Sequence, residues 1–137
     1  MTSYIPAEIR RDVMVRAAGR CEYCLIKESD TFLGFQVDHV IAEKHSGESI
    51  VSNLAYACTY CNRFKGSDIG SIAASTGEFT RFFNPRADKW NDHFRWEGFE
   101  IDYRTPIGEA TSAILQFNLS DRILEREAIH EAADSGS

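Results

Sequence analysis

The spacing of apolar residues near the start of the chain predicts an amphipathic helix over residues 6–18. Ile9, Val13 and Ala17 recur at every fourth position and would share one face of that helix. Gly19 follows the stretch, and glycine commonly ends a helix. The chain therefore opens with a helix whose apolar face needs a partner.

Two strands and a short helix are predicted next. Residues 32–41 are rich in β-branched and aromatic side chains, which favours a strand. Residues 42–52 are rich in glutamate, lysine, serine and glycine and indicate a loop, and residues 53–57 supply a returning strand. Thr59 can then cap a helix over residues 60–65.

The second half of the chain predicts further short elements. Residues 77–83 alternate as a strand, and residues 93–97 and 99–104 flank a glycine as in a β-hairpin. Residues 106–117 carry apolar side chains at helical spacing, and a last helix is expected from Ser120 to about residue 130.

No linker-like stretch separates the two halves. The sequence therefore predicts one domain over residues 1–137. Its core would cover about residues 16–67, and residues 78–131 would form an extension that packs on this core.

Composition allows a globular protein with a real core, since 43% of the residues are hydrophobic and 12% are aromatic. No apolar run reaches the roughly 20 residues that span a bilayer, and the N-terminus lacks the pattern of a secretory signal. We therefore expect a cytoplasmic protein with no membrane partner. The net charge of −6 counts against nucleic-acid binding by the whole surface. Any such contact must depend on a local basic face and on bound metal, which favours weak, salt-sensitive binding.

Four cysteines occur as two Cys-x-x-Cys pairs, Cys21 with Cys24 and Cys58 with Cys61. In a reducing compartment this pattern favours metal binding over disulfides, and two such pairs complete a closed tetrahedral zinc site. A redox pair or a zinc redox switch is the alternative, but nothing around either pair resembles a redox βαβ unit. Because thiolates would fill all four positions, this zinc ion is predicted to be structural and not catalytic.

Between and beside the two pairs lie residues suited to hydrolysing a phosphodiester. Asp38 and the amide oxygen of Asn62 are ligands that a hard cation such as magnesium accepts, together with water and substrate phosphate. Histidine is a common general base at neutral pH, so His39 can take a proton from the attacking water. Adjacent strand residues point to opposite faces, so Asp38 and His39 are expected to need a local twist or bulge to act together.

These motifs resemble the HNH endonuclease family in its cysteine-bearing form. The resemblance covers about residues 16–67 and runs through Val37-Asp38-His39-Val40-Ile41, Asn53-Leu54 and Cys58-x-x-Cys61-Asn62-x-x-Lys65-Gly66. The later segments Phe83-Asn84-Pro85-Arg86 and Trp90-x-Asp92-His93-Phe94-x-Trp96-x-Gly98 also resemble a group of small bacterial stand-alone HNH proteins.

The resemblance implies an α+β fold with a ββα-metal (His-Me finger) core, a four-cysteine structural zinc site, an N-terminal helix and a C-terminal hairpin-plus-helix extension. It implies that His39 is the general base and that Asp38 and Asn62 bind a single catalytic magnesium or manganese ion. Asn53 would brace the hairpin loop and orient His39.

One loop departs from the family pattern. Many members carry Gly-Gly after the catalytic histidine, whereas this chain has His45 followed by Ser46-Gly47-Glu48. His45 is a candidate contact to substrate or metal, and a loop histidine in solvent fits the pattern equally well. Arg63 and Lys65, on the helix that carries Asn62, are the predicted phosphate contacts.

Two functions of different classes follow. The first is a metal-dependent endonuclease that hydrolyses phosphodiester bonds, with DNA as the expected substrate. A homodimer would make a double-strand break easier. The second is a zinc-stabilised module that binds nucleic acid or protein without useful catalysis. The acidic charge supports the second, and the presence of Asp38, His39 and Asn62 together favours the first.

Overall fold

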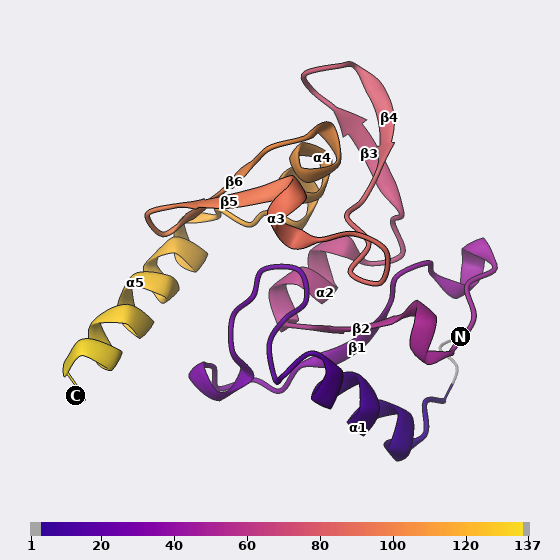
Figure 1. Cartoon of the computed structure of the whole chain (residues 1–137), viewed down its shortest axis with the longest axis horizontal. Coiled ribbons are helices and arrows are strands. Elements are labelled where there is room, and N and C mark those ends of the chain that lie inside the picture. The colour runs from indigo at the N-terminus through magenta and orange to yellow at the C-terminus, as the bar shows by residue number, and fades with distance from the viewer. Residues whose placement is uncertain (1–3, 136–137) are drawn as a thin grey trace.

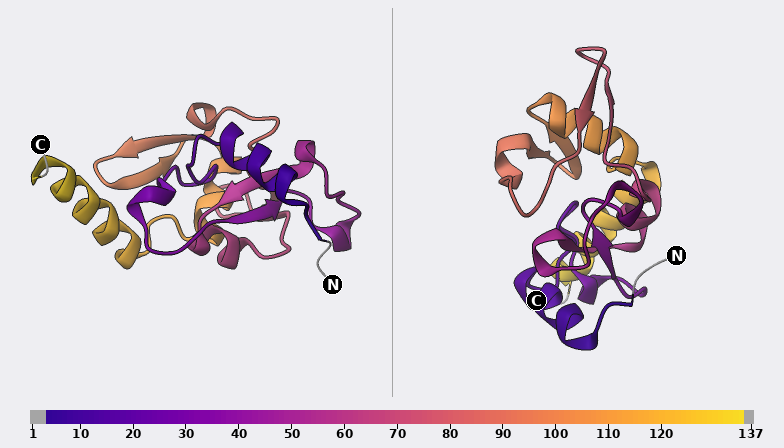
Figure 2. Two further views of the ribbon diagram at one scale, coloured as in Figure 1. Left: turned by 90° about the horizontal axis from the view of Figure 1, so that it is seen from below. Right: turned by 90° about the vertical axis from the view of Figure 1, so that its right-hand side faces the viewer.

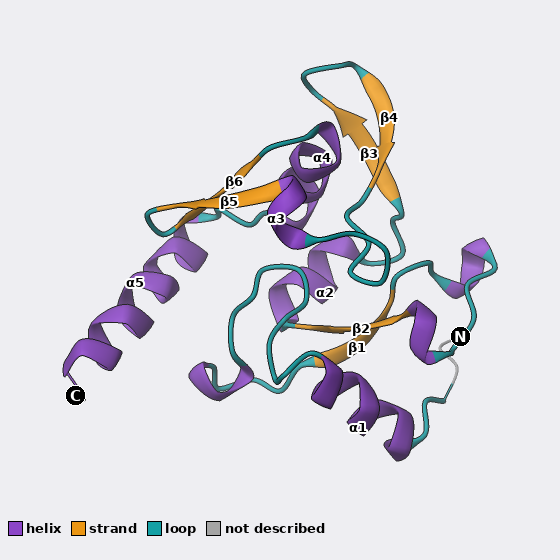
Figure 3. Ribbon diagram, viewed as in Figure 1, coloured by secondary structure: helices purple, strands orange, loops and turns teal. Residues whose placement is uncertain are grey.

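The computed structural model describes residues 4–135 and shows a mixed α+β fold in which helices alternate with short antiparallel hairpins (Figure 1 and Figure 3). The described strands form three separate two-stranded sheets, β1-β2, β3-β4 and β5-β6. Within residues 4–135, no helix is long and apolar enough to cross a membrane.

A β-hairpin and one helix form the centre of the first half. Strand β1 (Gln36–His39) pairs antiparallel with β2 (Leu54–Ala57), and helix α2 (Thr59–Lys65) follows directly. The expected hairpin and helix are therefore confirmed, but β1 is shorter than predicted. The apolar segment before β1 is loop, where Phe32 is fully exposed.

The ends of α2 follow from local chemistry. The N-cap is Cys58 and not the expected Thr59, because the Sγ of Cys58 accepts a hydrogen bond from the backbone N–H of Cys61. Gly66 ends the helix at a φ of +53°, a backbone conformation that glycine adopts without a steric penalty.

Helix α1 (Ala7–Arg16) covers the face of the hairpin that carries Leu54 and Tyr56. Val13 is fully buried in this contact, as the periodicity predicts. The guanidinium of Arg16 donates hydrogen bonds to the backbone carbonyls of Val51 and Leu54. The helix is thus fixed to the hairpin by apolar packing and by hydrogen bonds.

The loops of this half contain three turns of 3-10 helix, η1 (Glu28–Asp30), η2 (Glu43–His45) and η3 (Val51–Asn53). The last two lie in the segment between β1 and β2, which the sequence predicts only as loop.

The extension, taken from residue 70 to residue 135 in the structure, contains two further hairpins and three helices. Its elements are β3 (Gly70–Ala73), β4 (Glu78–Arg81), α3 (Trp90–His93), β5 (Phe94–Glu97), β6 (Glu100–Tyr103), α4 (Pro106–Leu115) and α5 (Ser120–Ser135). The hairpin around Gly98 and both long helices are confirmed, although α5 continues past residue 130. Strand β3 and the single-turn helix α3 are not predicted by the sequence patterns.

The two halves share one hydrophobic core. Cys21 and Tyr23 from the first half pack in the same buried cluster as Phe83, Phe94 and Phe117 from the extension. The C-terminal part of α5 projects from the rest of the molecule (Figure 2). On this packing we propose that the chain is a single domain.

Candidate active site and metal centre

The four cysteines converge on one point in the interior. The turn before β1 supplies Cys21 and Cys24, and the start of α2 supplies Cys58 and Cys61. All four are buried, and their Sγ atoms lie within 4.8 Å of one another. The Sγ atoms of Cys24 and Cys58 are 3.7 Å apart. A tetrahedron with Zn–S bonds of ~2.3 Å has edges of about 3.8 Å, so the donor set and its spacing fit a zinc ion.

The backbone supports the same cluster. The N–H groups of Cys24 and Cys61 donate to the Sγ atoms of Cys21 and Cys58, each at 3.4 Å. Burial raises the pKa of the Cys21 and Cys61 thiols, because a desolvated thiolate is costly. Hydrogen bonds from the other thiols, Cys21 first, lower the pKa of Cys24. A bound divalent cation would supply the charge that lets all four ionise.

Helix α5 brings a cation to this cluster that the sequence does not reveal. The Nη2 atom of Arg122 lies 3.2 Å from the Sγ of Cys61, and Nη1 donates to the carbonyl of Leu115 at 2.7 Å. Burial acts to lower the pKa of Arg122, but the neighbouring cysteines raise it on balance. Nothing in the local sequence distinguishes Arg122 from the other basic residues of α5. Only its long-range contact in the folded chain identifies it.

Two other contacts tie the extension to the first cysteine turn. Arg86 forms a largely buried ion pair with Glu22, and the indole N–H of Trp90 donates to the carbonyl of Tyr23 at 2.9 Å. Arg86 and Trp90 lie in the two segments that resemble the small stand-alone HNH proteins. These segments therefore contact the turn between Cys21 and Cys24.

A second group of polar residues lines a cleft of about 460 Å³ beside β1 and α2. Asp38, His39 and Asn62 all line it, so the structure brings the predicted catalytic groups to one cavity. Residues in or next to α1, β1, η2 and the end of α2 also line the cleft. They are Arg10, Gln36, Val37, Ala42, Glu43, Lys44, Gly66 and Ser67.

Asp38 is 5% exposed and has two protein partners. The hydroxyl of Tyr23 donates to its Oδ2 at 2.7 Å, and the ammonium of Lys65 lies 3.1 Å from the same oxygen. Burial raises the pKa of the Asp38 carboxyl, and Lys65 and then Tyr23 act against that rise.

His39 follows Asp38 directly, so its side chain leaves β1 on the opposite face. The strand pairs in regular register, with Asp38 opposite Ala55 and His39 opposite Leu54, so the expected bulge is absent from this described strand pair. Both residues nonetheless line the cleft. The Nε2 atom of His39 lies 2.8 Å from the hydroxyl of Ser49.

Asn53 ties the loop after β1 to the start of β2. Its Oδ1 accepts from the N–H of Ile41, and its Nδ2 donates to the carbonyls of Ile41 and Glu48, each at 2.9 Å. These bonds hold the segment that carries Ser49 and faces His39.

Asn62 lies on α2, half-buried at the cleft. Within residues 4–135, its carboxamide makes no hydrogen bond, whereas its backbone N–H and carbonyl complete the helix. The side chain is therefore available to a ligand in the cleft.

The three residues predicted to contact substrate, Arg63, Lys65 and His45, do not line this cleft. Lys65 is 1% exposed, and its ammonium binds Asp38 and the carbonyl of His39, so it is not free to meet a phosphate. Arg63 is exposed but lines a different cavity, and His45 is exposed on η2 without lining the cleft. The structure instead brings Arg10 and Lys44, both exposed, to the cleft.

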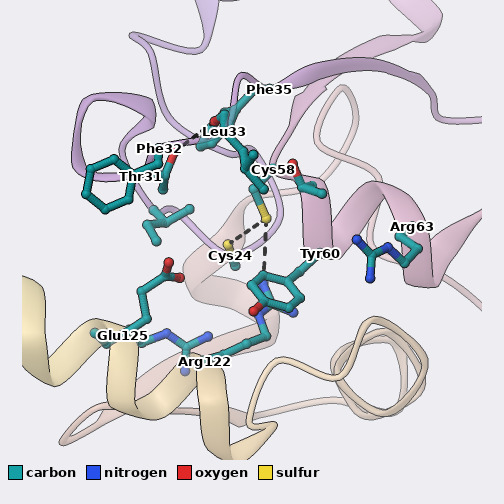
Figure 4. A pocket seen from close by; sticks show the side chains of 13 residues that line it. Cys24, Thr31, Phe32, Leu33, Phe35, Cys58, Tyr60, Arg63, Arg122 and Glu125 are labelled. Carbon is teal, nitrogen blue, oxygen red and sulfur yellow. Dashed lines mark hydrogen bonds between the residues drawn. The ribbon is translucent and has the colours of Figure 1, made fainter.

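The cavity that Arg63 lines, of about 240 Å³, lies beside the cysteine cluster. Figure 4 shows Tyr60 and Arg122 next to the sulfurs of Cys24 and Cys58, with Phe32 and Leu33 nearby on the wall formed by the loop before β1. This cavity is more apolar than the cleft, and the described residues that line it do not include Asp38, His39 or Asn62.

Comparison with known proteins agrees with this geometry. Residues 21–68 match the family model described as HNH endonuclease. No curated protein and no solved structure match the chain. The matched segment begins at the first cysteine of the cluster and contains Asp38, His39 and Asn62. Residues 21–68 are therefore a segment similar to the HNH endonuclease domain.

Proposed function

We propose that this protein is a metal-dependent endonuclease that hydrolyses phosphodiester bonds in DNA. The observation that carries the proposal is that Asp38, His39 and Asn62 line one cleft within the HNH segment, apart from the closed cysteine cluster. In this arrangement zinc has a structural role, and a second, exchangeable magnesium or manganese ion binds in the cleft.

Asp38 and Asn62 are the residues that would hold the exchangeable ion. A carboxylate can accept in about four directions, and Tyr23 and Lys65 take up three contacts on Asp38. One direction on Oδ1 remains, and the carboxamide oxygen of Asn62 is unpartnered among the described residues. Oxygen donors of this kind suit a hard cation that keeps several waters. When bound, such an ion supplies positive charge to the phosphate oxygens as negative charge develops on them.

His39 is the proposed general base. Its imidazole accepts a proton from the attacking water as the water oxygen bonds to phosphorus, the bond from phosphorus to the leaving sugar oxygen breaks, and that oxygen takes a proton from solvent. Ser49 at Nε2 fixes the plane of the ring, and Asn53 holds the loop that carries Ser49. The base is thus positioned by side-chain contacts on the loop, which reduces the cost of orienting it during the reaction.

Arg10 and Lys44 are the proposed phosphate contacts. They line the cleft from α1 and η2 and are both exposed, unlike Lys65. Two cations on one face also provide the local basic surface that a chain of net charge −6 needs for nucleic acid. Since one cleft cuts one strand at a time, we propose that double-strand cleavage uses a homodimer.

The proposal is tested by relaxation of supercoiled plasmid in magnesium, manganese, calcium and a chelator. Wild-type protein should nick the plasmid with magnesium or manganese, and His39→Ala should lose about 10²–10⁴-fold in rate, the range for a missing general base. His45→Ala is the matched control, because His45 is exposed and lies outside the cleft. Zinc content should be the same in all three proteins. Equal cutting by His39→Ala would contradict the assignment of the base.

One observation favours a second function, a binding module without useful catalysis. Lys65 already neutralises Asp38, which lowers the attraction of this carboxylate for a cation. Such a module would bind DNA in the same assay without cutting it at any concentration of divalent ion.

A further inference from the structure

Tyr23 connects the two metal-binding regions of the molecule. It lies inside the first Cys-x-x-Cys turn, between Cys21 and Cys24, and is 0% exposed. Its hydroxyl crosses from the cysteine cluster to Asp38 and donates to Oδ2 at 2.7 Å. A single buried side chain therefore links the turn that carries Cys21 and Cys24 to Asp38 in the cleft.

The position of this hydroxyl is fixed from several sides. Two cysteine sulfurs hold the backbone on either side of Tyr23, and the indole of Trp90 donates to its carbonyl oxygen at 2.9 Å. The phenol ring has only two rotatable bonds and lies in the shared core. A hydrogen bond to an ionised carboxylate is short and strong, so the ring can fix the rotation of the Asp38 carboxyl.

We infer that Tyr23 is a positioning residue for the exchangeable-ion site, because its hydroxyl turns the Asp38 carboxylate so that Oδ1 faces the cleft. The inference rests on the proposed function, since it assumes that Asp38 binds a cation. Lys65 contacts both carboxylate oxygens and therefore does not select between them, whereas Tyr23 contacts Oδ2 alone. Without the hydroxyl, the carboxyl can rotate about its terminal bond, a torsion with a broad energy profile.

Tyr23→Phe removes the hydroxyl and keeps the packed ring. The measurement is Mn²⁺ binding to the zinc-loaded protein, followed by the electron paramagnetic resonance signal of free Mn²⁺. Loss of a residue that orients a metal ligand typically weakens metal binding 10–100-fold, and we expect about a tenfold increase in the Mn²⁺ Kd at the low end of that range. Zinc should stay bound, since none of its four ligands changes.

Tyr56→Phe is the matched control. Its hydroxyl also donates to a carboxylate, Oε1 of Glu28, at 2.7 Å, but its ring packs in the α1 cluster on the other face of the hairpin. This variant should bind Mn²⁺ as the wild type does. If Tyr23→Phe keeps its zinc and binds Mn²⁺ with the wild-type Kd, the inference is wrong while the proposed nuclease stands. If the wild type binds no Mn²⁺, the proposed function itself fails.

A second measurement needs no change at Tyr23. Titrating Mg²⁺ into the zinc-loaded wild type should give a tyrosine ultraviolet difference spectrum, because a cation on Asp38 changes the hydrogen bond that the phenol donates. The spectrum should persist in Tyr56→Phe. Saturating Mg²⁺ binding without any tyrosine signal would overturn the inference even if Tyr23→Phe fails to fold.

Discussion

At the scale of single residues, Asp38 is held from two sides in the cleft, because the buried Tyr23 and Lys65 both contact its carboxylate. Asp38, His39 and Asn62 are recognisable by type and spacing, and all three reach one cavity. Tyr23 and Lys65 lie 15 and 27 residues from Asp38 along the chain, so no local sequence pattern reveals them as its partners. The same is true of Arg122 at the cysteine cluster.

The basic residues at the cleft are likewise not identified by local sequence patterns. Helical spacing predicts that Lys65 shares a face with Asn62, but that face also meets Asp38, and a buried carboxylate attracts the ammonium before a substrate can. Arg10 and Lys44 reach the cleft only because α1 and η2 fold against it.

Replacing these two cations should weaken DNA binding. Arg10→Ala and Lys44→Ala, each made in a His39→Ala background to prevent cutting, should raise the Kd and reduce the salt dependence of binding. Each lost phosphate contact should make the negative slope of log K against log salt shallower by about 0.9 for duplex DNA. Fluorescence anisotropy with a labelled duplex at several salt concentrations measures both quantities.

Arg63→Ala is the control for that series, since Arg63 is also exposed but lines the other cavity. We expect a smaller effect on the slope. If Arg63→Ala changes the slope more than Arg10→Ala and Lys44→Ala do, the DNA binds at the cavity that Arg63 lines and not at the cleft.

At the scale of elements, long periodic segments are well predicted and short ones are not. Helices α1, α4 and α5 and the β5-β6 hairpin follow from periodicity and from a glycine at the turn. Strand β3 has only four residues and carries an exposed Ile72 opposite an exposed Phe79, so it lacks the inside-outside alternation that marks a strand. Helix α3 is a single turn whose formation depends on packing.

Helix α5 has a role that its position at the end of the chain does not suggest. Arg122 places a guanidinium against two cysteine sulfurs and donates to the carbonyls that end α4. A zinc ion with four thiolates carries a net charge of roughly −2, and a buried cation beside it offsets part of that charge. The helix would thus stabilise a zinc ion bound by the four cysteines, two of which lie at the start of α2.

Arg122→Met should therefore destabilise the protein by about 3 kcal/mol, the range for removing one partner from a buried charge pair. Zinc should also pass faster to a competing chelator. Urea unfolding measures the free energy, and a chromogenic chelator measures the rate of zinc transfer.

Arg95→Met provides the comparison at an exposed ion pair with Asp102, where solvent screens the charges and little or no loss of stability is expected. If the two variants have equal stability and equal rates of zinc transfer, then Arg122 does not support the metal centre.

At the scale of the whole molecule, the cysteine cluster lies where the two halves meet. The shared core joins the cysteines to aromatic residues of the extension, and Arg86, Trp90 and Arg122 reach the cluster or its turn from three parts of the extension. The family model covers residues 21–68 only, so the match describes neither helix α1 nor the extension.

Zinc removal should consequently unfold both halves in one transition. Treatment with a zinc chelator under reducing conditions should abolish the near-ultraviolet circular dichroism of the extension aromatics together with the ellipticity of the helices. Adding zinc should restore both signals, whereas adding magnesium should not. A folded extension that survives zinc loss would show that the halves are independent domains.

On this proposal, one molecule holds two metal ions of different kinds at two separate sites. Anomalous diffraction from a crystal of the zinc-loaded protein soaked in Mn²⁺ would locate both ions. We predict zinc among the four Sγ atoms and manganese in the cleft, where the Asp38 carboxylate and the Asn62 amide oxygen would hold it. Manganese bound without Asp38 and Asn62, or absent from the cleft at saturating concentration, would contradict the account.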